Sequence, residues 1–138
     1  MADQIELCLE RYKEITRLIE GDSDATDLLE DLTSSAMRYV RNVAYERSVV
    51  IPARNGDGDG DIGSTKRRVE NADFQRRASH EALISGLNSF NRYLFSKKKN
   101  VPKGGIYTLD PLTIDDRFKV GDWAWDYVRA LTRLNSGE

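Results

Sequence analysis

Apolar side chains recur at three- and four-residue steps in four stretches of the chain, which is the pattern of helices with one buried face. The first stretch covers residues 3–20. Asp3 with Glu6 predicts a capping box at its start, and Gly21 predicts its end. The second stretch begins near Ser23, so only a short turn separates the two helices. Such a turn predicts that helices one and two are antiparallel.

The second helix is predicted to end near Arg47. The β-branched residues that follow favour extended backbone, and Pro52 disfavours helix in the residue before it. Residues 52–64 contain four glycines and three aspartates. Glycines and aspartates at this density break regular structure, so we expect a flexible surface loop there.

A third helix is expected to begin between Ser64 and Asn71 and to end near Phe95. Its second half is amphipathic. In its first half the same face carries the polar residues Asp73, Arg76 and His80. Either this half projects beyond the core, or its polar groups are buried and must be paired.

A fourth helix is expected from about Asp115 to Leu134, followed by a frayed end at residues 135–138. The four stretches together predict an all-α fold, a four-helix bundle with a long Gly/Asp loop between helices two and three. A length of 138 residues fits a single helical domain over residues 1–138.

The composition narrows the class of protein. No apolar run is long enough to span a bilayer, and the first residues lack the pattern of a signal peptide. We therefore expect a cytoplasmic protein without a membrane partner. Cys8 is the only cysteine, so no internal disulfide can form, and its place on an apolar stripe predicts a buried thiol. No motif in the chain calls for a cofactor.

Charge is unevenly distributed along the chain. Residues 1–31 carry three basic and ten acidic side chains, a net of −7, whereas residues 64–103 carry ten basic and three acidic ones, a net of +7. The basic side chains lie at 66–77, including Arg67, Arg68, Arg76 and Arg77, and at 97–103. They predict either a nucleic-acid surface or a complement to the acidic first helix.

The Gly/Asp loop has part of a calcium motif. Asn55, Asp57 and Asp59, with Asp61 beside them, resemble the first ligands of an EF-hand loop. The position of the bidentate carboxylate is Lys66, which cannot bind calcium. An acidic loop without metal is therefore favoured over a calcium site.

His80 is the only histidine and a candidate general base, with Arg76 or Arg77 available to stabilise negative charge. A pair of Arg and His on a helical bundle is similar to helical ribonuclease domains. The spacing departs from theirs, because three residues separate Arg76 from His80 and two separate Arg77 from it. A structural role for His80 is the competing interpretation.

Three segments between residues 76 and 128 carry a family resemblance: Arg77-Ala78-Ser79-His80, Asn91-Arg92 and Arg117 to Trp123. They resemble a family of small uncharacterised helical bacterial proteins, some of them carried by mobile elements. The resemblance implies a helical bundle of bacterial origin and assigns no activity.

His80, Asn91, Arg117 and Asp122 are predicted to form a buried polar network that fixes the docking of helices three and four, or else to line a small anion pocket. The sequence favours a non-catalytic binding or regulatory module that acts on a protein partner or through self-association. Nucleic-acid binding through 66–77 and 97–103, and a ribonuclease-like or other hydrolase centred on His80, are the alternatives.

Overall fold

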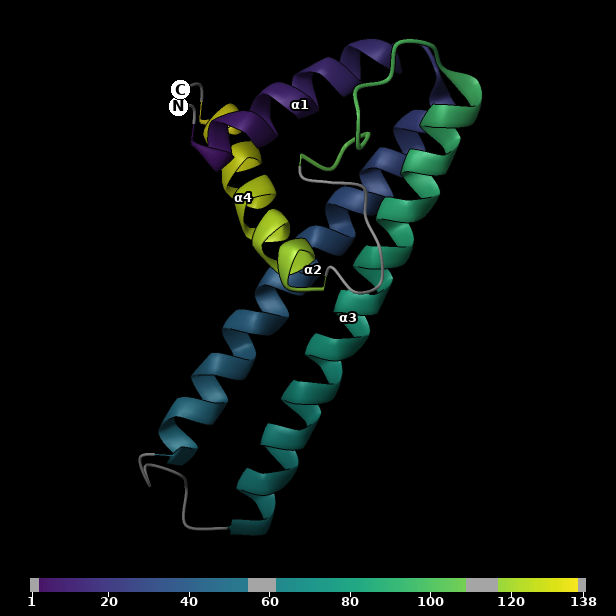
Figure 1. The fold of residues 1–138 in the computed structure, drawn as a ribbon. Coiled ribbons are helices and arrows are strands. Elements are labelled where there is room, and N and C mark those ends of the chain that lie inside the picture. Colours follow the sequence, from purple (N-terminus) through teal and green to yellow (C-terminus); the bar gives the residue numbers. More distant parts are fainter. Residues whose placement is uncertain (1–2, 55–61, 109–116, 137–138) are drawn as a thin grey trace.

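The computed structural model describes residues 3–54, 62–108 and 117–136. These residues form four α-helices: α1 (Gln4–Leu18), α2 (Ser23–Arg54), α3 (Ile62–Lys97) and α4 (Arg117–Asn135), shown in Figure 1. The described residues contain no β-strand. The predicted all-α fold of four helices is confirmed.

The first two helices meet at a sharp turn. The Asp3 side chain accepts a hydrogen bond from the backbone N–H of Glu6 at 2.7 Å, which is one of the two hydrogen bonds of the predicted capping box. Gly21 has a φ of 83°, which a glycine adopts without steric cost, and the Asp22 carboxylate accepts from the N–H of Ala25 at 3.1 Å to cap α2. The chain reverses direction there, and α1 and α2 diverge from the turn as a V (Figure 1).

Both long helices exceed their predicted bounds. The predicted end of the second helix near Arg47 is wrong, because α2 continues through Pro52 to Arg54. The predicted loop at 52–64 is wrong at both ends, since α3 already begins at Ile62. Residues 55–61 lie outside the described part of the chain.

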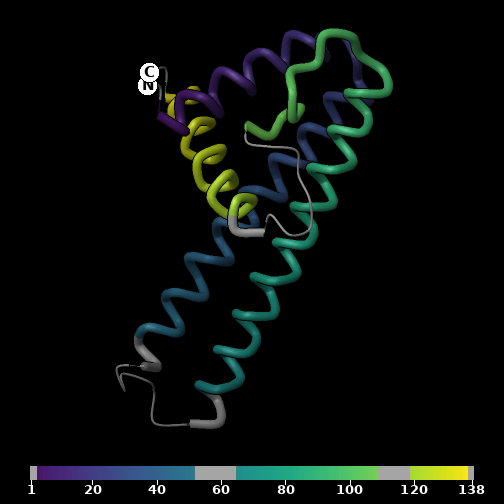
Figure 2. The backbone as a smooth tube through the Cα atoms, viewed as in Figure 1, coloured from purple at the N-terminus to yellow at the C-terminus, as the bar shows by residue number. Residues whose placement is uncertain are grey.

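Helices α2 and α3 form a long antiparallel hairpin, and α1 and α4 pack against only one end of it (Figure 2). The other end projects on its own. We call this projecting end, residues 44–54 of α2 and 62–76 of α3, the arm, and the rest of the structure the body.

The hydrophobic core lies in the body. Its largest fully buried side chains include Trp123, Tyr127, Phe90 and Tyr107. Trp123 stacks on Tyr127 with ring centroids 4.6 Å apart and an interplanar angle of 12°. Because most of the buried apolar residues lie in the body, the body contributes most of the hydrophobic stabilisation of the fold.

Candidate functional site

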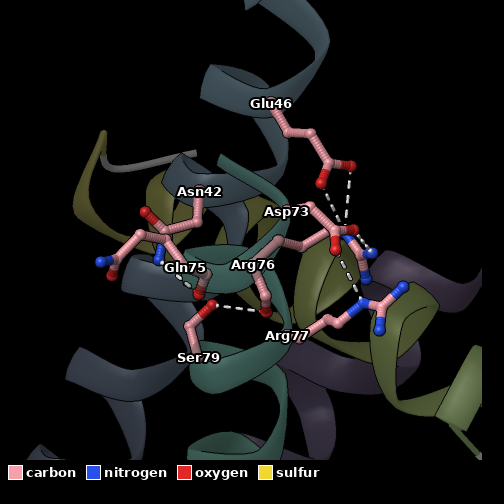
Figure 3. A network of polar contacts seen from close by, with 7 residues as sticks. All are labelled: Asn42, Glu46, Asp73, Gln75, Arg76, Arg77 and Ser79. Atoms are coloured by element: carbon pink, nitrogen blue, oxygen red, sulfur yellow. Dashed lines mark hydrogen bonds and ion pairs between the residues drawn. The ribbon is translucent and has the colours of Figure 1, made fainter. Parts of the chain in front are cut away.

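Most of the polar first half of α3 lies in the projecting arm, and its residues Asp73, Arg76 and Arg77 form ion pairs. Arg76 Nε donates to both carboxylate oxygens of Glu46 on α2 at 3.0 Å, and Arg76 Nη2 donates to Asp73 at 2.8 Å. Arg77 Nε lies 3.0 Å from the other Asp73 oxygen (Figure 3). Burial works to lower the pKa of Arg76, but the hydrogen bonds to Glu46 and Asp73 outweigh it and the net pKa is raised. These contacts fix α3 against α2 at the root of the arm.

His80 follows one turn after Arg76 and is buried, with 8% of its surface exposed. Its ring packs against Tyr39 of α2, with ring centroids 5.1 Å apart. The Tyr39 hydroxyl in turn lies close to the backbone of α4, since a Cβ added at Gly121 would be 3.0 Å from it. Glycine at 121 therefore allows α4 to approach Tyr39 closely, which is the packing reason for a glycine inside this helix.

Two hollows adjoin where α4 meets the root of the arm. The first, about 470 Å³, is lined by Tyr39, Val43, Arg47, Arg76, Arg77, His80, Glu81, Gly121, Asp122 and Trp125. The second, about 510 Å³, is lined by Gln4, Arg47, Asp122, Trp123, Trp125, Asp126 and Arg129. Arg47, Asp122 and Trp125 belong to both, so we treat the two hollows as one site and call it the α4 cleft.

Trp125 lies at the centre of the α4 cleft. The guanidinium carbon of Arg47, from α2, lies 5.8 Å from the Trp125 ring centroid, and that of Arg129, one turn later on α4, lies 5.7 Å from it. Each contact is a cation–π interaction, worth about 0.5–1 kcal/mol where water has access. The Trp125 ring is half-buried, so part of it faces the cleft.

Charges of both signs line the α4 cleft. The basic residues are Arg47, Arg76, Arg77 and Arg129, and the acidic ones are Glu81, Asp122 and Asp126. Arg76 is already paired with Glu46 and Asp73. Burial raises the pKa of Asp126, an effect that Arg129 partly offsets. The cleft therefore presents no field of a single sign, unlike a site built for a polyanion.

The structure brings four of the predicted site residues together, since Arg76, Arg77, His80 and Asp122 all line the first hollow. Asn91 lies apart from them. Its side chain donates to the Gly104 carbonyl at 3.2 Å and accepts from the Ile106 N–H at 2.9 Å, so it holds the segment after α3. The predicted network is thus divided between two places.

The remaining predicted residues lie elsewhere. Arg67 and Arg68 are exposed on the arm and line neither hollow of the cleft. Arg117 is the first residue of α4, and its side chain lies outside the described part of the structure. The candidate calcium ligands Asn55, Asp57, Asp59 and Asp61 lie outside the described residues as well.

Sequence reasoning missed Arg47 and Arg129, the two arginines beside Trp125. One signal was available, because Arg129 follows Trp125 by four residues and the two must share a face of α4. Arg47 gave no signal, since its place beside Trp125 depends on how α2 and α4 cross.

The two predicted basic stretches lie at opposite ends of α3. Lys97 follows Arg77 by twenty positions, which places them about 30 Å apart along the helix. Within the second stretch Lys98 pairs with Asp22 at 2.8 Å, and the Lys103 carbonyl accepts from Arg11 at 2.9 Å. The two stretches therefore do not form one continuous surface.

Two further features bear on the class of protein. Among the described residues, no group of three or more His, Cys, Asp or Glu side chains is arranged to hold a metal ion. None of the described helices has the length and apolar character needed to cross a bilayer.

Comparison with known proteins gives a family and no activity. No curated protein matches the chain. A family model described as a protein of unknown function, DUF3232, matches residues 2–133, which is nearly the whole chain. The earlier resemblance to uncharacterised helical proteins agrees with this match. The chain belongs to the DUF3232 family, whose function is unknown.

Proposed function

We propose that this protein is a non-catalytic binding module that holds a segment of another protein in the α4 cleft. The observation that carries the proposal is Trp125, which is half-buried, lines both hollows of the cleft and has the guanidinium groups of Arg47 and Arg129 near its ring. Tryptophan and arginine are the residues most enriched at the energetic centres of protein interfaces.

The charge pattern favours a protein ligand over a nucleic acid. A polyanion is attracted by a continuous basic surface, because its binding releases counterions from many phosphates. The α4 cleft instead contains residues of both signs, Arg47 and Arg129 together with Asp122 and Asp126. A peptide segment can complement such a pattern, because its side chains carry both signs and its backbone offers donors and acceptors.

The size of the cleft fits a few side chains of a partner. Its hollows of about 470 Å³ and about 510 Å³ fall within the range of small-ligand pockets. We expect the partner to insert an apolar or aromatic side chain next to the Trp125 ring, with an acidic group near Arg47 or Arg77.

The test compares Trp125→Ala with Phe95→Ala, a matched control that removes an exposed aromatic residue at the far end of α3. Proteins retained by the wild type are purified and titrated calorimetrically against both variants. We expect Trp125→Ala to weaken binding at least tenfold, about 1.4 kcal/mol. Equal affinity of the two variants for every purified partner would refute the proposal.

A hydrolase centred on His80 is the second candidate, because His80 lines the first hollow together with Arg77 and Asp122. Here the chain would cleave a phosphodiester or similar bond with His80 as general base. Hydrolysis of RNA by the wild type that is lost in a folded His80→Gln variant would favour this function over simple binding. Retention of RNA without hydrolysis, lost in Arg67→Ala with Arg68→Ala, would favour nucleic-acid binding.

A further inference from the structure

A further hollow lies in the V between α1 and α2, which diverge from the turn at Gly21 (Figure 1). It measures about 620 Å³ and shares no lining residue with the α4 cleft. Its lining residues fall within 12–20 of α1 and 26–34 of α2, and we call it the α1–α2 groove. Among the described residues, these two helices alone line it. The groove is therefore separate from the site of the proposed function.

The charged residues that line the α1–α2 groove are both acidic. Glu20 of α1 and Glu30 of α2 are exposed, and within the described part of the chain neither forms an ion pair. Residues 12–34 carry seven acidic and two basic side chains, a net of −5. The two basic ones, Lys13 and Arg17, are exposed on α1 but do not line the groove. The groove therefore presents two carboxylates without a counter-charge.

The basic residues at the body end of α3 lie outside the groove. Arg92, Lys97 and Lys99 are exposed, but no described residue of α3 lines the groove. Lys98 pairs with Asp22 at 2.8 Å, and neither of these residues lines it. The body end as a whole thus carries both signs of charge, whereas the lining of the groove is acidic.

Two threonine hydroxyls of the groove can only accept hydrogen bonds from a ligand. Thr16 Oγ1 donates to the Lys13 carbonyl at 2.8 Å, and Thr26 Oγ1 donates to the Asp22 carbonyl at 2.9 Å. A hydroxyl has one proton, so only its lone pairs remain for a ligand. The two lining carboxylates, when ionised, also only accept. A ligand that donates hydrogen bonds, as ammonium and guanidinium groups do, therefore suits the groove.

Next to each carboxylate the lining is apolar. Ile19 precedes Glu20 and Leu29 precedes Glu30, and both of these apolar side chains are buried, at 3% and 6% exposed. Lysine and arginine place their hydrocarbon stems along apolar surface while the charged end reaches a polar group. The pairing of an apolar lining with carboxylates therefore complements both parts of a basic side chain.

We propose that the α1–α2 groove is a second docking site, which takes a helical segment of a partner protein with basic side chains one turn apart. Its walls run from Tyr12 to Glu20 and from Thr26 to Ser34. Each wall is about 12 Å long, which matches two turns of a partner helix. One basic side chain reaches Glu20 on the first wall, and another reaches Glu30 on the second. The acidic lining repels a polyanion, so a nucleic acid is disfavoured here.

The test uses two short fluorescent amphipathic peptides, one built from leucine and lysine and the other from leucine and glutamate. Fluorescence anisotropy measures their binding. We expect the lysine peptide to bind the wild type and the glutamate peptide not to bind. The variant Glu20→Gln with Glu30→Gln should weaken binding of the lysine peptide about tenfold, because it removes both carboxylates of the groove and keeps their size.

The matched control is Glu14→Gln with Asp31→Asn, which removes two exposed carboxylates of the same helices that do not line the groove. It changes the net charge equally and should bind the lysine peptide as the wild type does. Trp125→Ala should also bind it as the wild type does, which separates this site from the α4 cleft. An equal loss of binding in both carboxylate variants, a loss in Trp125→Ala, or no binding to the wild type would overturn the proposal.

Two further measurements address the other possible occupants of the groove. Displacement of the lysine peptide by an equal concentration of spermidine would identify a free polyamine as the ligand. Self-association of the wild type in sedimentation, lost in Glu20→Gln with Glu30→Gln, would identify a second copy of the chain. We expect neither result, and either one would overturn the assignment of a partner protein.

Discussion

Asn91 holds the chain after α3 with two hydrogen bonds that run in opposite directions. Its amide donates to the Gly104 carbonyl and its carbonyl accepts from the Ile106 N–H, while Gly104 and Gly105 have φ values of 86° and 64°. A Cβ at residue 105 would collide with the Asn91 side chain. The sequence showed a polar residue on a core-facing stripe but could not show its partner, because the contact depends on how this glycine turn folds back.

Asn91→Ala is expected to destabilise the fold by about 1–3 kcal/mol, because it leaves the buried Ile106 N–H without its acceptor. Denaturant unfolding monitored by circular dichroism measures the change. Asn71→Ala, at an exposed position of the same helix, should change the stability by less than about 0.5 kcal/mol. Equal effects of the two substitutions would contradict the role assigned to Asn91.

Asp22 gives the stability of the protein a dependence on acid. Hydrogen bonds from Lys98, Tyr93 and the Ala25 N–H lower its pKa from 3.8 to about 2. The pKa of Asp22 is lower in the folded protein than in the unfolded chain. The stabilisation that ionised Asp22 gives to the fold is therefore fully present above pH 3.8 and is lost as the pH falls towards about 2.

Asp22→Asn should therefore be less stable than the wild type at neutral pH, and the difference should shrink between about pH 4 and pH 2. Urea unfolding at a series of pH values measures it. As a control, Asp27→Asn removes an exposed carboxylate of α2. Lys98 and Tyr93 bond to Asp22 and not to Asp27. A difference that stays constant from neutral pH to pH 2 would rule out the linkage.

At the scale of the element, periodicity predicted every helix, and local rules placed some ends wrongly. The bounds of α1 and α4 lie within a few residues of those expected. The end of α2 was misplaced because β-branched residues and Pro52 argue against helix. In the structure Val50 and Val69 are half-buried and Ala72 is buried, so packing between the two helices of the arm outweighs local preference.

The arm buries few apolar side chains, so the pairing of Arg76 with Glu46 and Asp73 matters for its local stability. Arg76→Ala removes the ion-pair partner of Glu46 and one of the two partners of Asp73, which still contacts Arg77, and should weaken the arm by about 1–2 kcal/mol. Hydrogen exchange at residues 65–75 should then accelerate about tenfold. Arg77→Ala is the control, since that side chain is 72% exposed and its ion pair contributes little. Unchanged exchange in Arg76→Ala would contradict the assignment.

At the scale of the whole molecule, the sequence could predict only one wall of the α4 cleft, the wall that α3 forms. Arg76, Arg77 and His80 are close in sequence on one helix, so their proximity follows from helical spacing alone. The opposite wall comes from Arg47 on α2 and Trp125 on α4. That wall exists only because α4 crosses the hairpin at the root of the arm, and such a crossing is a property of the packed fold.

The division into body and arm predicts two separate opening events, and Cys8 can report on one of them. Cys8 is 2% exposed in the body, and its burial, opposed in part by a hydrogen bond with Thr108, raises the pKa of the thiol from 9.0 to about 11. Reaction with a thiol reagent at neutral pH therefore requires the body to open.

Asn91→Ala should accelerate the labelling of Cys8 from the opened state about tenfold for each 1.4 kcal/mol of lost stability. Arg76→Ala should leave the labelling rate unchanged even though it loosens the arm. Acceleration by both substitutions to the same extent would show instead that arm and body unfold as one cooperative unit, because the loss of a contact at the arm would then be felt throughout the core.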